Sequence, residues 1–246
     1  MGKNAIISVF DKTNLDLIAK FLIKKKYTIY STGGTSQYLK GINIPHIEIS
    51  KYTKQKEILD GRVKTLHPKI FGGLLGTNSQ KHQKEQKNQG IVIFDILVIN
   101  LYPFEDTIKR TKDESKIIEM IDIGGHSLIR AAVKNYNHTI PITNPSDYKN
   151  FIKAYPLNQT QRKIFAKKAI QQVANYDNAI FNWFDGNTKD EYELRYGENP
   201  HQNARALVNN DKFTQLSGDK KLSYNNLLDL DAAVKIAYGV NTKNNI

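Results

Sequence analysis

Short apolar runs alternate with amphipathic stretches through the first 150 residues, and this alternation constrains the fold more than any other feature. Strands of a parallel sheet are covered by helices on both faces, so they read as continuous apolar runs separated by amphipathic connections. The clearest run is FDILVINLY at 94–102, which suits a central parallel strand. The pattern therefore predicts an α/β fold built on a parallel sheet.

The same pattern locates the individual elements and a domain boundary. Strands are expected at 5–10, 27–32, 46–50, 94–102 and 138–143. Helices are expected near 15–22 (with Thr13 or Asn14 as the cap), 35–39, 115–121, 127–134 and 159–184. After Gly186 the sequence becomes polar and rich in turn residues, so we expect one domain over 1–190 and a separate segment over 191–246. That segment is small for an independent core.

Composition argues against several classes of protein. No stretch reaches the roughly 20 apolar residues of a membrane-spanning helix, and the first residues show no secretory signal. We therefore expect a cytoplasmic protein with no membrane partner. Cysteine is absent and the histidines lack metal-ligand spacing, so no metal site is expected. The net charge of +12 comes from 30 Lys and only 6 Arg, scattered along the chain. Nucleic-acid readers rely on Arg, so no nucleic-acid partner is expected.

The segment STGGT at 31–35 lies between an expected strand and an expected helix. Paired glycines allow a tight turn, and the free N–H groups at the start of a helix attract an anion. Gly33 and Gly34 therefore mark a candidate anion site, although the same residues also suit an ordinary tight turn.

The segment GRVKTLHP at 61–68 carries two cations, Arg62 and Lys64, two positions apart. In an extended segment such side chains point the same way, and Thr65 adds a hydroxyl group nearby. This combination suits the binding of a phosphate or the polarisation of a carbonyl group. The alternative is a solvated basic loop.

The segment NLYP at 100–103 follows the strongest predicted strand. Ligands of open α/β sheets bind beyond the carboxyl ends of the strands. Asn100 and Tyr102 are therefore expected where a polar side chain meets a substrate. The alternative for Tyr102 is a ring packed beneath a loop.

The segment IDIGGHSLIRAAVKN at 121–135 combines an acid with a base. Asp122 precedes a Gly–Gly turn, and Lys134 comes twelve residues later at the end of a predicted helix. If the turn brings the two side chains together, the carboxylate orients the ammonium. The alternative leaves Lys134 at a helix C-terminus, where it interacts with the helix dipole.

These segments, with SVFDK at 8–12, occur in an order and spacing that resembles the bifunctional enzymes with AICAR transformylase and IMP cyclohydrolase activities. LRYGENPHQNARA at 194–206 and YNNLLDLDAA at 224–233 resemble the start of the transformylase domain. The resemblance implies a methylglyoxal-synthase-like fold with a doubly wound parallel sheet. It also implies ring closure of a formamido-imidazolecarboxamide ribotide (FAICAR) to IMP, the last step of de novo purine biosynthesis.

The resemblance implies roles for individual residues. Lys134 and Asp122 would form a dyad that handles protons, and Lys64 with Tyr102 would stabilise a developing oxyanion. The substrate contacts carried over are Ser8, Phe10, Asp11, Lys12, Thr32, Gly33, Gly34, Thr35, Arg62, Val63, Thr65, Ile99, Asn100, Ile123 and Gly124, with Arg195 and Tyr196 from the transformylase motif.

The resemblance also bears on cofactors and partners. No cofactor is implied for the cyclisation, because Lys, Tyr, Asp and backbone N–H groups suffice for proton transfer and charge stabilisation. Folate, as 10-formyltetrahydrofolate, belongs to the transformylase half, whose KHTNPCG-like segment is absent from this sequence. We therefore expect a truncated or naturally split protein, a small-molecule ribotide substrate, and a homodimer as in the family. A separate transformylase chain is one way to supply the other half.

Two other functions remain open at this point. The same fold serves as a nucleotide-binding regulatory module, which needs an anion site but no Lys–Tyr or Lys–Asp pairs. Methylglyoxal synthase is a second enzyme of this fold, and it would need a carboxylate base in a different local pattern.

Overall fold

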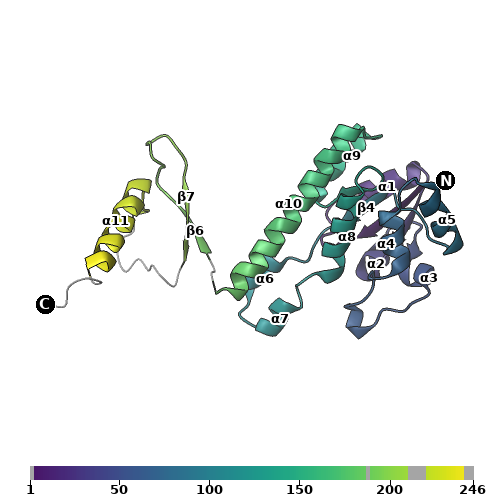
Figure 1. Ribbon diagram of the computed structural model, residues 1–246, viewed down its shortest axis with the longest axis horizontal. Coiled ribbons are helices and arrows are strands. Elements are labelled where there is room, and N and C mark those ends of the chain that lie inside the picture. Colours follow the sequence, from purple (N-terminus) through teal and green to yellow (C-terminus); the bar gives the residue numbers. More distant parts are fainter. Residues whose placement is uncertain (1–2, 187–188, 210–219, 241–246) are drawn as a thin grey trace. The chain divides into compact units, whose positions relative to one another are not determined.

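The computed structural model describes residues 3–186, 189–209 and 220–240 of the chain (Figure 1). The chain divides into two compact units, Met1–Ile180 and Phe181–Ile246. The division falls near the end of the long helix α10 (Gln159–Phe184), about ten residues before the boundary expected near residue 190. Within the described ranges, no helix is both long enough and apolar enough to cross a membrane.

The first unit is built on a five-stranded parallel sheet with the strand order β3-β2-β1-β4-β5. The strands are β1 (Lys3–Ser8), β2 (Tyr27–Ser31), β3 (Ile47–Glu48), β4 (Ile96–Ile99) and β5 (Ile140–Ile142). The chain runs outward from β1 to β3 and returns to β4 on the other side of β1, so the order reverses between β1 and β4. The five expected strands are confirmed, although β3 has only two residues because α3 (Ile49–Thr53) begins directly after it.

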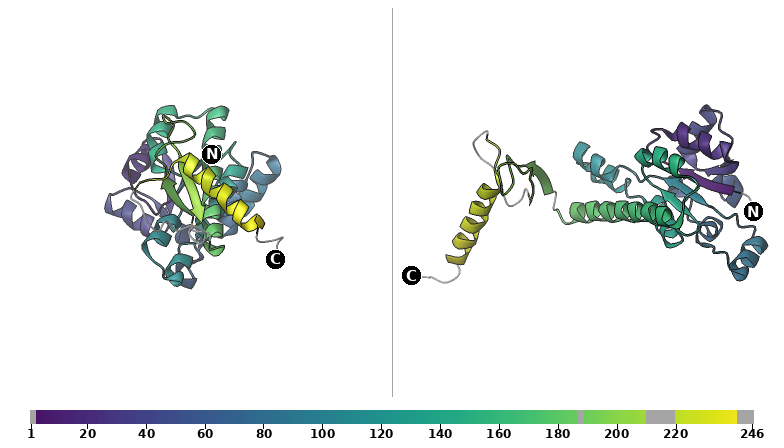
Figure 2. Two further views of the ribbon diagram at one scale, coloured as in Figure 1. Left: turned by 90° about the vertical axis from the view of Figure 1, so that its left-hand side faces the viewer. Right: turned by 90° about the horizontal axis from the view of Figure 1, so that it is seen from above.

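Helices cover both faces of this sheet (Figure 1, Figure 2). On one face, α1 (Leu15–Lys24) and α9 (Tyr148–Ala154) bury their apolar sides against β1, β2, β4 and β5. On the other face, α8 (Ile123–Lys134) packs on β4, on β5 and on α4 (Pro68–Leu75). Alternate strand residues point to opposite faces, and all four residues of β4 are buried, which explains the continuous apolar run. The doubly wound parallel sheet is therefore confirmed.

The remaining helices of this unit lie in the connections: α2 (Gly33–Gly41), α5 (Gln80–Asn88), α6 (Phe104–Arg110), α7 (Glu114–Ile118) and two 3-10 turns at Leu59–Gly61 and Pro145–Asp147. The predicted helix at 159–184 is confirmed as α10 with the same bounds. The predicted side-chain cap of α1 is wrong. Asn14 precedes α1, but its backbone is left-handed (φ 56°) and its side chain makes no capping hydrogen bond.

The second unit contains a hairpin followed by a helix (Figure 2). The antiparallel strands are β6 (Lys189–Glu193) and β7 (Arg205–Asn209), and the helix is α11 (Tyr224–Val240). Leu228, Val234 and Ile236 of this helix are exposed, while Leu227 and Leu230 are partly buried. The unit therefore presents an apolar surface on α11.

Candidate active site

A cavity of about 720 Å³ opens at the carboxyl ends of β1, β2 and β4. Its walls include Ser8 at the end of β1, Thr32 just after β2 and Asn100 just after β4. The strand order reverses between β1 and β4, and open α/β sheets bind ligands in the crevice beside such a reversal. A cavity of this size and position suits a small-molecule ligand.

The turn from β2 into α2 forms one wall of this pocket. Thr32, Gly33, Gly34 and Thr35 all line it, and Gly33 has a left-handed backbone (φ +38°), which glycine adopts without strain. Gly33 and Gly34 are the first residues of α2, so their N–H groups have no partner within the helix. Together with the helix dipole, these donors favour an anion. The pocket side of the STGGT turn thus has the geometry of an anion site.

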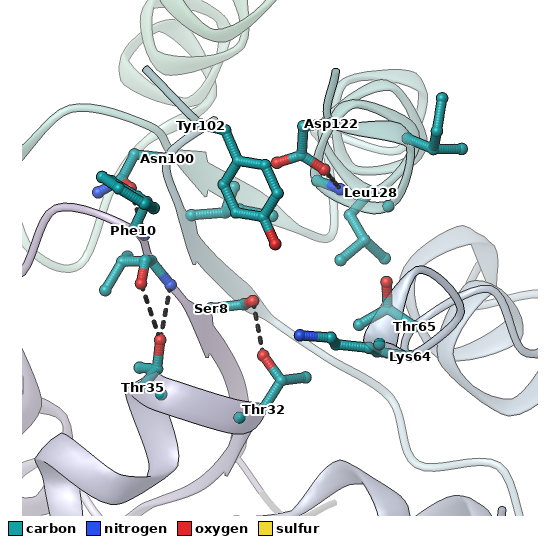
Figure 3. A pocket seen from close by; sticks show the side chains of 18 of the residues that line it. Ser8, Phe10, Thr32, Thr35, Lys64, Thr65, Asn100, Tyr102, Asp122 and Leu128 are labelled. Carbon is teal, nitrogen blue, oxygen red and sulfur yellow. Dashed lines mark hydrogen bonds between the residues drawn. The ribbon is translucent and has the colours of Figure 1, made fainter. Parts of the chain in front are cut away.

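The hydroxyl groups of this wall are already engaged with β1. Ser8 Oγ lies 2.8 Å from Thr32 Oγ1, so the ends of β1 and β2 are linked (Figure 3). The buried Thr35 hydroxyl accepts from the backbone N–H of Val9 at 3.0 Å and donates to its carbonyl oxygen at 2.9 Å. Because its hydroxyl group is hydrogen-bonded to the backbone of Val9, Thr35 fixes the shape of this wall of the pocket.

Asn100 holds the loop between β1 and α1 in place. Its Oδ1 accepts from the backbone N–H groups of Phe10 (2.6 Å) and Asp11 (3.0 Å), and its Nδ2 donates to the carbonyl oxygen of Asp11 (2.9 Å). Lys12 lines the pocket next to this loop, with its Nζ donating to the carbonyl oxygen of Phe10 at 3.0 Å. The amide of Asn100 is thus committed to the loop, and Lys12 supplies a cation at the pocket.

The expected substrate contact of Asp11 does not fit the structure. The Asp11 side chain is exposed and is not among the described residues that line the pocket. Its Oδ1 accepts from the backbone N–H of Thr13 at 2.8 Å, and hydrogen bonds with Thr13 lower the pKa of this carboxyl group. Asp11 is therefore a turn-forming residue in this structure.

The segment after the turn at Leu59–Gly61 brings cations to the pocket beside the start of α2. Arg62, Lys64 and Thr65 line the pocket, and Arg62 pairs with Glu119, another lining residue. The ammonium of Lys64 points into the cavity (Figure 3). A Cβ atom added at Gly33 would lie 3.6 Å from Lys64 Nζ, so the ammonium sits over the start of α2. Two positive features, the ammonium and the helix terminus, therefore meet at one wall.

Val63 does not contribute to this wall. It bridges to Ile58 in a short antiparallel contact and is not among the described lining residues. The predicted extended geometry is wrong, because Arg62 has a helical backbone (φ −63°, ψ −25°) and the segment forms a turn. The predicted substrate contact of Val63 stays a prediction, whereas Arg62, Lys64 and Thr65 all line the pocket.

Tyr102 reaches the pocket from the end of β4, and its hydroxyl group points into the cavity (Figure 3). Its ring packs edge-to-face against Phe10, with ring centroids 5.7 Å apart at 68°. Phe10 is half exposed (49%), so the two rings form an apolar rim beside the polar wall. The packing of the Tyr102 ring on Phe10 thus directs the hydroxyl group into the pocket.

Asp122 caps α8 and faces the same cavity. Its Oδ1 accepts from the backbone N–H of Gly125 at 2.6 Å, and a Cβ atom at Gly125 would lie only 2.5 Å from Asp122 Oδ2. Burial raises the pKa of the Asp122 carboxyl group, while hydrogen bonds from the backbone of Gly125 and Tyr102 partly offset that rise. The charge of Lys64 acts in the same offsetting direction. Asp122 is therefore a carboxyl group suited to carrying a proton.

The predicted dyad of Asp122 and Lys134 is wrong. Asp122 precedes α8 and Lys134 is its last residue, so the two lie at opposite ends of a 12-residue helix. At about 1.5 Å per residue, that helix separates them by ~18 Å. Lys134 is exposed and is not among the described residues that line the pocket. The glycines after Asp122 continue the helix instead of turning the chain back.

Several residues at the site carried no signal that singled them out in the sequence. The last residue of α7, Ile118, lines the pocket, as do Glu119 and Met120 of the connection that leads to α8. Tyr176 of α10 supports this connection, since its hydroxyl accepts from the backbone N–H of Asp122 at 2.9 Å and donates to the carbonyl oxygen of Met120. These contacts span more than 50 positions, so local pattern could not predict them.

The other predicted residues divide between the two units. Ile99, Ile123 and Gly124 line the pocket, as do Ser8, Phe10 and Lys12. Arg195 and Tyr196 belong to the second unit, where the Arg195 guanidinium lies 5.4 Å from the Tyr196 ring centroid and 3.2 Å from Asn226 Oδ1. Among the residues that the structure describes, no group of three or more His, Cys, Asp or Glu residues is arranged to hold a metal ion.

Comparison with protein families accounts for nearly all of the chain. Residues 14–127 match the MGS-like domain, and residues 132–245 match the AICARFT/IMPCHase bienzyme. The chain belongs to the AICARFT/IMPCHase bienzyme family. Its fold accordingly is the methylglyoxal-synthase-like one that the sequence implied.

Individual relatives agree with this membership. The chain is 41% identical over 268 residues to the bifunctional purine biosynthesis protein PurH of Prochlorococcus marinus (strain MIT 9515), covering 100% of this chain and 52% of the relative. It is 43% identical to PurH of Clostridium acetobutylicum, covering 96% of this chain and 51% of the relative. The chain thus spans about half the length of the curated relatives it matches. The crystal structure of ForH superimposes with a TM-score of 0.67 at 26% identity, covering 75% of this chain and all of ForH.

Proposed function

We propose that this chain catalyses the IMP cyclohydrolase reaction, the dehydrative ring closure of FAICAR to IMP. One observation carries the proposal: Lys64, Tyr102 and Asp122 converge on a single pocket, and the start of α2 forms one of its walls. An anion site beside a cation, a phenol and a protonatable carboxyl group suits a phosphorylated substrate that must exchange protons. Membership in the bienzyme family supports the same reaction.

The ribotide phosphate is proposed to bind at the start of α2. The N–H groups of Gly33 and Gly34 and the helix dipole favour an anion there, and Lys12 lies on the same pocket. This anchoring leaves the imidazole ring and its two substituents near Lys64 and Tyr102. Because the reacting groups share one ring, the protein has only to rotate them together.

The chemical step joins the carboxamide nitrogen to the formyl carbon. The carboxamide nitrogen gives up one proton as it bonds to the formyl carbon, and the formyl oxygen becomes negatively charged. That oxygen takes up this proton and the proton of the formamide nitrogen and leaves as water, which closes the ring with a C=N bond. Lys64 and Tyr102 are proposed to stabilise the negative charge, since the ammonium nitrogen and the phenol oxygen both point into the pocket (Figure 3). Asp122 is proposed to accept and return the proton, because burial raises the pKa of its carboxyl group. Because Lys134 does not line the pocket, Lys64 is the cation that is proposed to act together with Asp122.

The proposal extends to cofactors, partners and location. The cyclisation uses groups of this chain and calls for no cofactor, whereas formyl transfer to AICAR would use 10-formyltetrahydrofolate on the transformylase half. A homodimer, a separate transformylase chain and a cytoplasmic location remain predictions from the sequence. The substrate contact proposed for Arg195 and Tyr196 belongs to the transformylase reaction.

Two other functions make different demands on the same pocket. A regulatory nucleotide-binding module would bind IMP at α2 without turnover, and methylglyoxal synthase would act on dihydroxyacetone phosphate. The convergence of Lys64, Tyr102 and Asp122 favours turnover of a ribotide over simple binding.

Product analysis by mass spectrometry separates these functions. The purified 246-residue chain would be incubated in turn with FAICAR, with AICAR plus 10-formyltetrahydrofolate, and with dihydroxyacetone phosphate. The proposal predicts IMP from FAICAR and no product from the other two mixtures. Tight binding of IMP without turnover of FAICAR would support the regulatory module instead.

A further inference from the structure

A second, smaller cavity adjoins the pocket at Lys64. It measures about 290 Å³ and shares Thr32, Gly33 and Lys64 with the larger one. Glu57 lines the smaller cavity and is not among the described residues that line the pocket. Lys64 is therefore part of the wall between the two cavities, and Glu57 approaches it from the side away from the pocket.

Glu57 and Lys64 form an ion pair, with Glu57 Oε2 3.7 Å from Lys64 Nζ. Two glycines with left-handed backbones, Gly33 (φ +38°) and Gly61 (φ +86°), pack closely around it. A Cβ atom at Gly33 would lie 3.8 Å from Glu57 Oε1, and a Cβ atom at Gly61 would lie 2.5 Å from Lys64 Cε. The lysine stem is therefore confined between these two backbone segments.

The position of the ammonium needs a compensating negative charge. Lys64 Nζ lies over the start of α2, and a helix N-terminus carries a partial positive charge that repels a cation. Glu57 supplies the opposite charge behind the ammonium. Without that carboxylate, the flexible lysine side chain is expected to turn towards solvent or towards the carboxyl group of Asp122, which its charge already influences.

We infer that Glu57 is a positioning residue that holds the Lys64 ammonium at the pocket wall, where negative charge develops during the reaction. This inference rests on the proposed function for its effect on catalysis. Glu57 acts through Lys64, because it faces the smaller cavity and not the pocket. The ion pair itself is independent of the reaction and gives the inference a second test.

The kinetic test compares Glu57→Gln with the matched control Glu48→Gln. Glu48 lines the same small cavity, but it pairs with Lys51 at 3.7 Å instead of with Lys64. Glu57→Gln is expected to lower kcat for FAICAR about tenfold with little change in KM, as expected for an interaction that matters in the transition state. Glu48→Gln is expected to leave both parameters unchanged.

A double variant distinguishes positioning from support of the fold. In a Lys64→Ala background, Glu57→Gln is expected to cause no further loss of kcat, because its target is gone. An equal loss in both backgrounds would overturn the inference, and so would a wild-type kcat in Glu57→Gln itself. A merely structural role would also lower the melting temperature of Glu57→Gln, which we expect to stay close to that of the wild type.

The second test needs no turnover, so its outcome is separate from that of the proposed function. The reaction of Lys64 with a limiting amine-acetylating reagent would be measured by peptide mass spectrometry. Glu57→Gln is expected to increase the modification of Lys64 several-fold, because the ion pair restrains the ammonium, while Glu48→Gln leaves it unchanged. Equal modification of Lys64 in all three proteins would contradict the inference even if FAICAR is turned over.

Discussion

The hydroxyl oxygen of Tyr176 lies 2.9 Å from the backbone nitrogen of Asp122, and the same hydroxyl donates to the carbonyl oxygen of Met120. One buried side chain of α10 therefore holds both sides of the turn that leads into α8. Asp122 begins that helix as its cap, so the position of its carboxyl group in the pocket depends on this turn.

Tyr176→Phe removes the hydroxyl but keeps the ring, which packs 6.0 Å from the Phe104 ring centroid. We expect the free energy of unfolding to fall by about 1–2 kcal/mol, because two partly buried backbone groups lose a hydrogen bond. We also expect a lower kcat for FAICAR, because the Asp122 carboxyl group is less well held. Urea denaturation and steady-state kinetics measure the two effects.

Tyr27→Phe is the matched control for that variant. The Tyr27 hydroxyl lies 3.1 Å from that of Tyr155, and Tyr27 begins β2 at the end of the strand away from the pocket. Its removal is expected to cost similar stability without a change in kcat. If both variants lose activity alike, Tyr176 has no particular role in placing Asp122.

Asp122→Asn should change how stability depends on pH. Burial raises the folded-state pKa of Asp122 above its ordinary value of 3.8. At a pH between 3.8 and the raised folded-state pKa, the folded protein binds more protons than the unfolded chain. The ionisation of Asp122 therefore lowers the stability as the pH rises through this window. Asn caps helices about as well as Asp, so the variant should gain stability relative to the wild type across the window and hold that gain above it.

Denaturation midpoints measured from about pH 4 to pH 8 would check this sign. The same variant is expected to lose most of its turnover of FAICAR, since an amide cannot carry the proton. The stability of Asp122→Asn relative to the wild type is therefore expected to rise with pH. If it falls instead, the neighbours of the Asp122 carboxylate stabilise its charge by more than burial penalises it.

Lys12→Ala tests the proposed phosphate site. A contact with the phosphate is the same in the ground state and the transition state, so KM should rise while kcat is unchanged. The rise is expected to be roughly tenfold or more, since a hydrogen bond to a charged group is worth about 1.5–3 kcal/mol. Lys20→Ala removes an exposed cation paired with Asp16 on α1 and should change neither parameter. A fall in kcat alone would place Lys12 at the reacting groups instead.

The sheet and the pocket walls were predictable because their signals are local. The apolar runs at 94–102 and 27–32 correspond to buried strands, and carboxyl ends of parallel strands meet at one edge. That rule brings Thr32 and Tyr102 to one pocket from segments far apart in sequence. Lys64 and Arg62 both line the pocket, as predicted, but the segment that carries them is a turn and not the expected extended one.

The wrong and missing predictions concern side chains whose positions depend on tertiary packing. Lys134 was misplaced because two glycines after Asp122 suggested a turn, whereas α8 runs without interruption from Ile123 to Lys134. Tyr176 was missed because nothing near it in sequence indicates that its hydroxyl contacts a turn more than 50 positions earlier. Glu57 was missed because an isolated acid beside a basic segment gives no sign of which cation it will pair with.

The most direct test of the account is the kcat for conversion of FAICAR to IMP by the wild-type chain, by Lys64→Ala and by Tyr102→Phe, followed by absorbance. Both side chains point into the pocket (Figure 3), and their proposed role is to stabilise charge that appears only in the transition state. We predict measurable turnover by the wild type and a kcat lowered roughly 10–1000-fold in each variant, with little change in KM. A wild-type chain that binds FAICAR but forms no IMP would contradict the account, and so would variants whose KM rises while kcat stays constant.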